Sequence, residues 1–363
     1  MKKALISLLT LFLLTACAEV PENIREQKKP TSSAVAFVPR KDYAFTIDKK
    51  FTAPTVEKLG KATFEQAYVP KATLIAAADN YYGSSLRDYV REDVFAAPEG
   101  IMYGNDESAL CGLGQNGYFY FSDPEGTAAG GDTELTMSPG DDSEEYIYAY
   151  DFEDTALTLN GSEVSLADLA DDAQQRLNDA SRLMGYSLKY KPFYARLGKY
   201  KAEAYRAELV FGLDNGDGSG VRTVFVLDDY DGGNSPWFSF SVEYSAPERP
   251  DSVRSSRGII LRTGLEETDE YISFEEAMDI VSEKLSDNVK LTLHFAQLEY
   301  LPRVTEFDPS AWKSTDSFNY QYGAKYTSDP YWAFYFEIKD NAQKVIYVNA
   351  LTGELSMMFN NDR

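Results

Sequence analysis

Hydrophobic residues recur along the chain at two spacings, and each spacing predicts a different kind of element. After Ser165 they follow the three-and-four spacing of a helix and share one face: Leu166, Leu169, Ala173, Leu177, Ala180 and Met184. After Ser273 the same spacing returns, in Phe274, Ala277, Val281 and Leu285. Both serines suit helix N-caps, and Glu276 completes a capping box with Ser273. The sequence therefore predicts two amphipathic helices, the first of which ends at Gly185.

Each predicted helix is followed by segments in which apolar and polar residues alternate, as they do in strands. After the first helix these segments are 186–196, 201–213, 221–228 and 237–244, and after the second they are 290–301, 331–338 and 344–350. Turns rich in Asp and Asn separate strands in both halves. We interpret this order as an internal repeat with units at 162–245 and 271–359, the second interrupted by residues 302–330.

The N-terminal third has a different pattern. Residues 41–161 contain short apolar segments separated by Gly and Asp turns, and one helix is expected to begin at or after Pro70. The predicted fold class is therefore α+β, with tandem helix-on-antiparallel-sheet units, PepSY-like or cystatin-like, behind an N-terminal β-rich region.

The first 16 residues have the pattern of a bacterial signal peptide. Two lysines precede an uncharged run that is shorter than the roughly 20 apolar residues needed to span a bilayer. The run ends in Leu14-Thr15-Ala16-Cys17, which resembles the lipobox of bacterial lipoproteins. This resemblance implies cleavage before Cys17 and a lipid on its sulfur, which would anchor an extracytoplasmic protein to the cell membrane. Residues 17–40 are then expected to be a polar, proline-containing tether.

Charge narrows the class of partner. Without residues 1–16 the chain has 33 Lys and Arg against 58 Asp and Glu, a net charge of −25. This charge opposes binding to nucleic acid and to anionic lipid, and it favours cationic partners or calcium. Once Cys17 carries lipid, only Cys111 remains, so no internal disulfide is expected.

The C-terminal segment is similar to a known family. Residues 345–355 read as a strand followed by a Thr352-Gly353-Glu354 turn, which resembles the end of the small extracytoplasmic PepSY-like domains. The resemblance covers about residues 271–359. It implies a helix packed on an antiparallel sheet, and a binding role such as inhibition of a protease or control of its maturation. The whole chain also resembles multi-domain lipoproteins of Gram-positive anaerobes, a likeness that implies no particular activity.

Motifs for catalysis are sparse. His294 is the single histidine, and the sequence has no H-E-x-x-H, G-x-S-x-G or P-loop motif. In the strand 291–295 the leucines and Phe295 are expected on one face, and His294 on the other with Thr292 and Ala296. Gly112–Gly117 matches G-x-G-x-x-G, but a strand comes after it, so we interpret it as a glycine turn. Cys111 beside it is interpreted as a buried apolar residue.

Two sets of residues are candidates for ligand binding. Carboxylates on Gly-rich turns suit calcium, and the candidates are Asp214, Asp217, Asp228, Asp229 and Asp231. Their spacing lacks the EF-hand pattern, and turn chemistry explains them equally well. The aromatic candidates are Trp312, Tyr320 and Tyr322 in the interrupting segment, whereas Trp237 and Trp332 are expected in the core. No other cofactor is expected.

The leading hypothesis is a surface-anchored lipoprotein with a non-enzymatic binding or regulatory role. Its partner would be an extracellular protein, a peptide or a glycan, in addition to the membrane that holds its lipid. The alternative is a hydrolase of glycans that uses two carboxylates, for which the 58 acidic residues supply many candidates and select none. A third interpretation is a structural component of the envelope.

Overall fold

The first predicted helix is present, with the predicted ends. In this computed structural model, α5 (Leu166–Leu183) begins after Ser165, whose hydroxyl accepts a 3.0 Å hydrogen bond from the Asp168 amide. This bond satisfies one of the amides that a helix leaves unpaired in its first turn. The chain leaves the helix at Gly185, where φ is 86°. A residue with a Cβ is disfavoured in that conformation, which explains why glycine stops the helix there.

The second predicted helix, α6 (Phe274–Lys284), begins after Ser273 with a full capping box. The Ser273 hydroxyl accepts a bond from the Glu276 amide, and the Glu276 carboxylate accepts one from the Ser273 amide. A third helix, α3 (Lys71–Tyr82), begins directly after Pro70, as expected.

The structure describes residues 42–82, 100–104, 109–122, 144–153, 155–159, 161–200, 203–221, 223–224, 237–238, 240–255, 258–285, 291–306, 325–338 and 342–359. All of these described residues belong to one compact unit. Within the described ranges, α3, α5 and α6 are accompanied by many more strands, which confirms the α+β class. None of these helices is long and apolar enough to cross a membrane.

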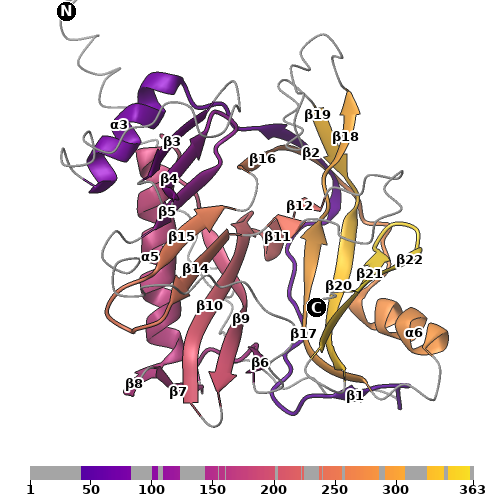
Figure 1. Cartoon of the computed structure of the whole chain (residues 1–363). Helices are drawn as coiled ribbons and strands as arrows, with labels where there is room; N and C mark the ends of the chain where they lie inside the picture. Colours follow the sequence, from indigo (N-terminus) through magenta and orange to yellow (C-terminus); the bar gives the residue numbers. More distant parts are fainter. Residues whose placement is uncertain are drawn as a thin grey trace, which may run out of the picture. The chain divides into compact units, whose positions relative to one another are not determined.

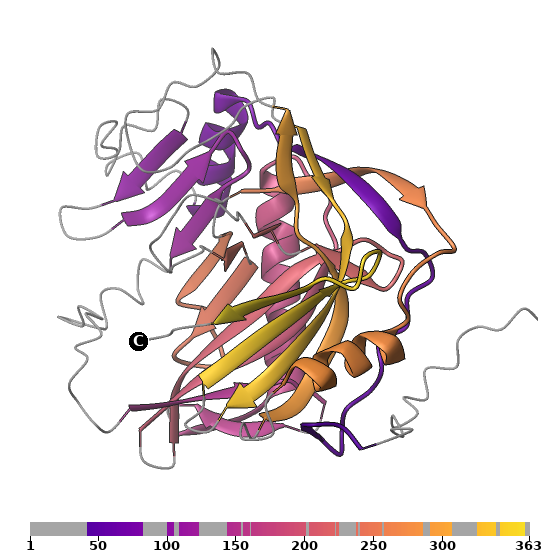
Figure 2. The same ribbon diagram turned by 90° about the vertical axis from the view of Figure 1, so that its right-hand side faces the viewer.

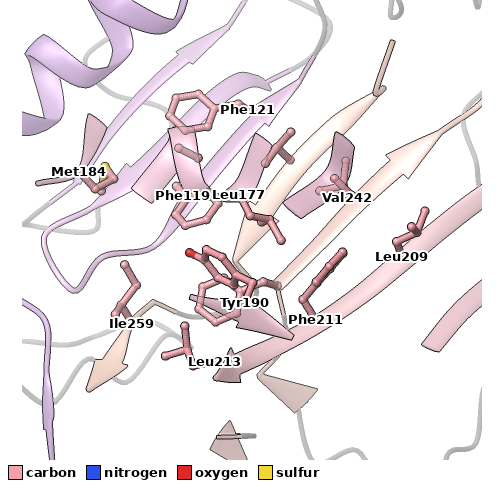
Figure 3. Close-up of a cluster of buried hydrophobic side chains, with 14 of the residues drawn as sticks. Phe119, Phe121, Leu177, Met184, Tyr190, Leu209, Phe211, Leu213, Val242 and Ile259 are labelled. Carbon is pink, nitrogen blue, oxygen red and sulfur yellow. The ribbon is translucent and has the colours of Figure 1, made fainter. Parts of the chain in front are cut away.

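An antiparallel meander of four strands comes after α5. Its strands are β9 (Tyr190–Tyr200), β10 (Glu203–Asp214), β14 (Phe240–Tyr244) and β15 (Ser252–Ser255), each antiparallel to the next. Ala207, Leu209 and Phe211 of β10 belong to the core cluster that also contains the apolar face of α5. Figure 1 shows α5 along this meander, and Figure 3 shows Leu177 of α5 among the apolar side chains of the strands.

A second meander of the same kind comes after α6. It consists of β17 (Leu291–Tyr300), β20 (Pro330–Ile338), β21 (Ala342–Asn349) and β22 (Leu355–Phe359), again antiparallel throughout. Phe274 and Val281 of α6 pack in a core cluster with Phe334 and Ile346 of the strands. Figure 2 shows α6 in orange against the yellow strands of this meander.

Short strands join the two meanders into one sheet. After β10 the predicted Asp-Asn-Gly turn leads into β11 (Ser219–Val221), which pairs with the end of β10. β11 then pairs in parallel with β17, with Ser219 opposite Leu298. Beyond β11 lie β12 (Thr223–Val224) and β13 (Trp237–Phe238), which pair with each other.

Other strands extend the first meander. β3 (Gly100–Gly104), β4 (Ala109–Gly114) and β5 (Phe119–Ser122) continue it beyond β15. On its other side, β6 (Glu144–Ala149) pairs with β9. β7 (Ala156–Leu159) pairs with β8 (Ser162–Ser165) and with β10.

Segments distant in sequence also combine. β1 (Thr46–Ile47) pairs with β17, and Phe45 and Phe51 lie in the core beneath α6. In a four-stranded sheet, β2 (Gly60–Gln66) lies between β16 (Ile260–Glu267) and β19 (Lys325–Ser328), and β18 (Arg303–Glu306) pairs with β19. Strands from the predicted region 41–161 therefore pair outside it: β1 pairs with β17, and β2 pairs with β16 and with β19 at one end of the segment 302–330. The domain boundaries themselves stay a prediction.

The predicted alternation along β17 was wrong at one point. The pairing of β17 with β20 shifts between Leu293 and Phe295, so β17 has a bulge at His294. A bulge adds one residue to one strand and reverses the facing of the residues beyond it. Phe295 therefore packs on the face away from α6, whereas Ala296 joins Leu291 and Leu293 in the core beneath α6.

Candidate functional site

The faces of the two meanders that lie away from their helices share a cluster of aromatic side chains. We call it the tyrosine layer and define it as Tyr148, Tyr150, Tyr194, Tyr331, Tyr335 and Tyr347. The ring centroid of Tyr194 on β9 lies 6.4 Å from that of Tyr335 on β20, and the ring of Tyr150 lies 6.2 and 6.3 Å from these two. These are ordinary distances for interacting aromatic pairs. The layer therefore joins the two meanders through side chains that combine apolar rings with hydroxyl groups.

Glu299 of β17 is a carboxylate within this layer, and its side chain is completely buried. Its Oε1 accepts hydrogen bonds from the Tyr335 hydroxyl and, at 2.7 Å, from Gln297 Nε2. Its Oε2 accepts a bond of 3.1 Å from the Tyr347 hydroxyl. Burial of a carboxylate is costly unless such donors replace water. Three side chains therefore hold one buried acid in a fixed position.

A lysine of the first meander is electrostatically linked to this acid. Burial lowers the pKa of Lys191 on β9, and the charges of Asp214 and Glu299 act in the opposite direction. Gln297 is also fully buried, and its Oε1 has no hydrogen-bond partner in the described part of the chain. The group thus contains an acid, a partly desolvated amine and one unsatisfied amide oxygen.

His294 lies at the edge of the layer, between two carboxylates. Its Nδ1 is 2.7 Å from Asp48 Oδ2, and its Nε2 is 2.9 Å from Glu337 Oε2. Nε2 makes no hydrogen bond within the described residues. The imidazole ring stacks on Tyr150 with centroids 5.6 Å apart. A catalytic base needs a nucleophile within hydrogen-bond reach, and here carboxylates are at both nitrogens.

A ladder of Arg and Glu side chains lies on the same face of the first meander. Glu208 of β10 contacts Arg196 Nη2 at 3.1 Å and Arg254 Nη2 at 2.6 Å. Burial raises the pKa of Glu208, but the two guanidinium groups outweigh burial and hold it below the ordinary value. The adjacent Glu243 is paired with Arg206. At Glu243, burial outweighs Arg206 and raises the pKa of the carboxyl group. Arginines nevertheless pair with both carboxylates, as expected for a structural network.

The two described calcium candidates are engaged in the turn before β11. Asp214 Oδ1 accepts a bond of 2.8 Å from the Gly216 amide. Asp217 Oδ1 accepts bonds from the amide and hydroxyl of Ser219, and its Oδ2 lies 2.6 Å from Arg262 Nη1. Turn chemistry and one ion pair thus explain both residues. Among the residues that the structure describes, no group of three or more His, Cys, Asp or Glu is arranged to hold a metal ion.

Many predicted site residues lie outside the described residues: Cys17, Asp228, Asp229, Asp231, Trp312, Tyr320 and Tyr322. Trp332 lies in the core as predicted, 4% exposed, and its ring nitrogen donates to the Ile272 carbonyl. Cys111 is fully buried, as interpreted. The first half of Gly112–Gly117 lies in β4, and the second half forms the turn toward β5, with Gly117 at φ 82°, which confirms a glycine turn.

Sequence reasoning missed Glu299 and its partners. The signal was the alternation of Gln297 and Glu299 with Leu298 after the bulge, which places two polar residues on the face opposite the leucine. A polar pair in a strand usually indicates a solvent-facing side, so the pattern alone does not reveal burial beneath a second set of strands.

Comparisons with known proteins add evidence on the fold alone. No family model matches the chain, and neither does any curated protein. Among solved structures it is similar to the crystal structure of an uncharacterised protein from Eubacterium rectale ATCC 33656, with 11% identity and a TM-score of 0.50. The similarity covers 87% of this chain and 91% of that chain. It therefore extends over most of both proteins and supports the α+β architecture.

Proposed function

We propose that this protein is a lipid-anchored extracytoplasmic lipoprotein with a non-enzymatic binding or regulatory role. The observation that carries the proposal is Leu14-Thr15-Ala16-Cys17, placed directly after a signal-peptide pattern. Acyl chains on one cysteine hold a protein at a membrane, since each buried methylene contributes about 0.8 kcal/mol. The acidic body adds no attraction to anionic lipid, so the lipid would be the sole attachment.

The tandem units are proposed to be PepSY-like. In support, α5 and α6 each precede a four-stranded antiparallel meander. The closing turn at Thr352-Gly353-Glu354 lies between β21 and β22, where the resemblance expects it. A PepSY-like domain in an envelope protein is more consistent with recognition of a partner than with catalysis.

The arrangement of buried acids also favours binding. Three buried carboxylates in the described ranges, Glu208, Asp217 and Glu299, already have partners, and so does the half-buried Glu243. A glycan hydrolase needs one acid that is protonated and a second that is free to act as base or nucleophile. Aromatic ligand contacts are proposed at Trp312, Tyr320 and Tyr322, in the segment that connects the paired strands β18 and β19.

The experiment compares the full chain with Cys17→Ser in the producing bacterium. The proposal expects the native protein in the membrane fraction and the variant in the soluble fraction. Pull-down from envelope extract with both forms should then capture the same protein or glycan. Release of reducing sugar from cell-wall glycan by the purified protein would instead establish the hydrolase alternative.

A further inference from the structure

Among the described residues, one edge of β22, the last strand of the larger sheet, has no pairing strand. Among the described residues β22 pairs with β21 alone, in regular register from Val348 opposite Leu355 to Lys344 opposite Phe359. Its sequence, Leu-Ser-Met-Met-Phe, contains no charge, proline or glycine. Those are the devices by which proteins usually block an edge strand. Of the strands that end the pairing order of the two larger sheets, β16 and β18 each contain a bulge, and the ladder of β3 with β4 is irregular between Tyr103 and Gly104.

The turn before β22 fixes which backbone groups point outward. The Asn349 amide donates to the Glu354 carbonyl at 2.8 Å. Since bonded pairs alternate along an antiparallel ladder, Ser356 and Met358 direct their backbone groups toward β21. The outward backbone groups therefore belong to Leu355, Met357 and Phe359. Water or one further strand can form hydrogen bonds with these outward backbone groups.

Acidic side chains surround the start of this edge. A Cβ added at Gly353 would lie 3.3 Å from Ile280 Cδ1, so the turn packs on that side of α6. Glu276 and Glu283, four residues before and three after Ile280, lie on the same side of the helix and are exposed. Glu354, directly before β22, is exposed too. Lys284, the one basic residue of α6, lies on this side too, four residues after Ile280, so three carboxylates stand against one amine.

We propose that the edge of β22 binds an extended, basic segment of a partner protein as an added strand. The proposal rests on the proposed binding role and gives it a surface and a class of partner. Main-chain hydrogen bonds would supply affinity, and the carboxylates beside β22 would select lysine or arginine. A second copy of the chain fits less well, because each copy without residues 1–16 has a net charge of −25.

The test uses the full chain in detergent and a fluorescent peptide of about ten alternating lysines and valines. Binding is followed by anisotropy, with a glutamate–valine peptide for comparison. Met357→Pro removes an outward amide, and proline is tolerated at an edge. Met357→Ala is the matched control, because it retains that amide. We expect the alanine variant to bind within about twofold of wild type, and the proline variant at least about tenfold more weakly.

Phe359→Pro serves as a second variant if Met357→Pro lowers the melting temperature. The proposal is overturned if Met357→Ala loses as much affinity for the lysine peptide as Met357→Pro does. It is also overturned if the wild type binds the glutamate peptide as tightly as the lysine peptide, or does not bind the lysine peptide. A dimer that Met357→Pro converts to monomer would assign the edge to a second copy instead. An envelope partner captured equally by wild type and Met357→Pro would leave the proposed function standing and refute only the edge.

Discussion

His294 Nδ1 lies 2.7 Å from Asp48 Oδ2, and this contact joins β17 to the segment that leads back toward the N-terminus. Next to it, the Asp48 amide donates to the Leu293 carbonyl at 2.9 Å. Lys50 forms a further ion pair of 2.5 Å with Asp151. The single histidine therefore helps to fasten the segment through which a lipid on Cys17 would hold the folded body.

Replacing His294 should loosen that segment. His294→Ala removes the contacts with Asp48 and Glu337, and partly exposed ion pairs are typically worth up to about 1 kcal/mol. We expect a loss of about 1 kcal/mol in the free energy of unfolding, measured with urea, and faster tryptic cleavage after Lys49 or Lys50. Glu266→Gln, on the exposed side of β16, is the control and should change neither. Unchanged cleavage in His294→Ala would refute the fastening role.

Glu299 should be structural. Glu299→Ala leaves the hydroxyls of Tyr335 and Tyr347 without their acceptor in a buried layer, which should cost about 3 kcal/mol of stability. Glu299→Gln retains one acceptor oxygen and should cost roughly half as much. Urea unfolding measures both. If Glu299→Ala is as stable as wild type, the carboxylate is not part of the fold and is better explained as held for a ligand.

Cys111 should be inert in the folded protein. Its side chain is fully buried, and burial raises the pKa of the thiol. The thiolate is the reactive form, so a maleimide should not label the native protein within the time that labels it fully in urea. With Cys17 lipidated, labelling in urea should reach one thiol per chain. Rapid labelling of the native protein would contradict the burial of Cys111.

The Asp217–Arg262 pair should stabilise the fold at neutral pH and lose its effect in acid. Burial raises the pKa of Asp217, but hydrogen bonds from Ser219 and Arg262 outweigh burial and hold that pKa below the ordinary 3.8. A carboxyl group with a depressed folded-state pKa contributes stability above its unfolded-state pKa and loses it as the pH falls. Asp217→Asn should therefore cost about 3 kcal/mol at pH 7 and progressively less below about pH 4. A difference independent of pH would contradict the pairing.

Calcium should leave the melting temperature unchanged. Asp217 is already paired with Arg262, and Asp214 caps its own turn. Melting curves with calcium and with chelator should coincide for the wild type. A rise of several degrees with calcium, absent from Asp217→Asn, would establish a calcium site that includes Asp217.

Local chemistry made much of this fold predictable from sequence. Ser165, Ser273 and Gly185 act within one turn of the chain, so residue type alone predicted their helix ends. The bulge at His294 was not predictable in this way, because it depends on the register with β20. The pairing of β1 and β2 with strands more than 190 residues away has no local signal either. Glu299 was missed for the same reason, since its burial requires the tyrosine layer from both meanders.

The central claim is the lipid on Cys17, and the mass of the membrane-extracted protein tests it most directly. The account predicts a chain that begins at Cys17, heavier than its amino acids by a diacylglyceryl group or by that group with a further acyl chain. It also predicts that Cys17→Ser lacks this mass. A membrane-bound chain that retains residues 1–16, or that begins elsewhere and carries no lipid, would contradict the account.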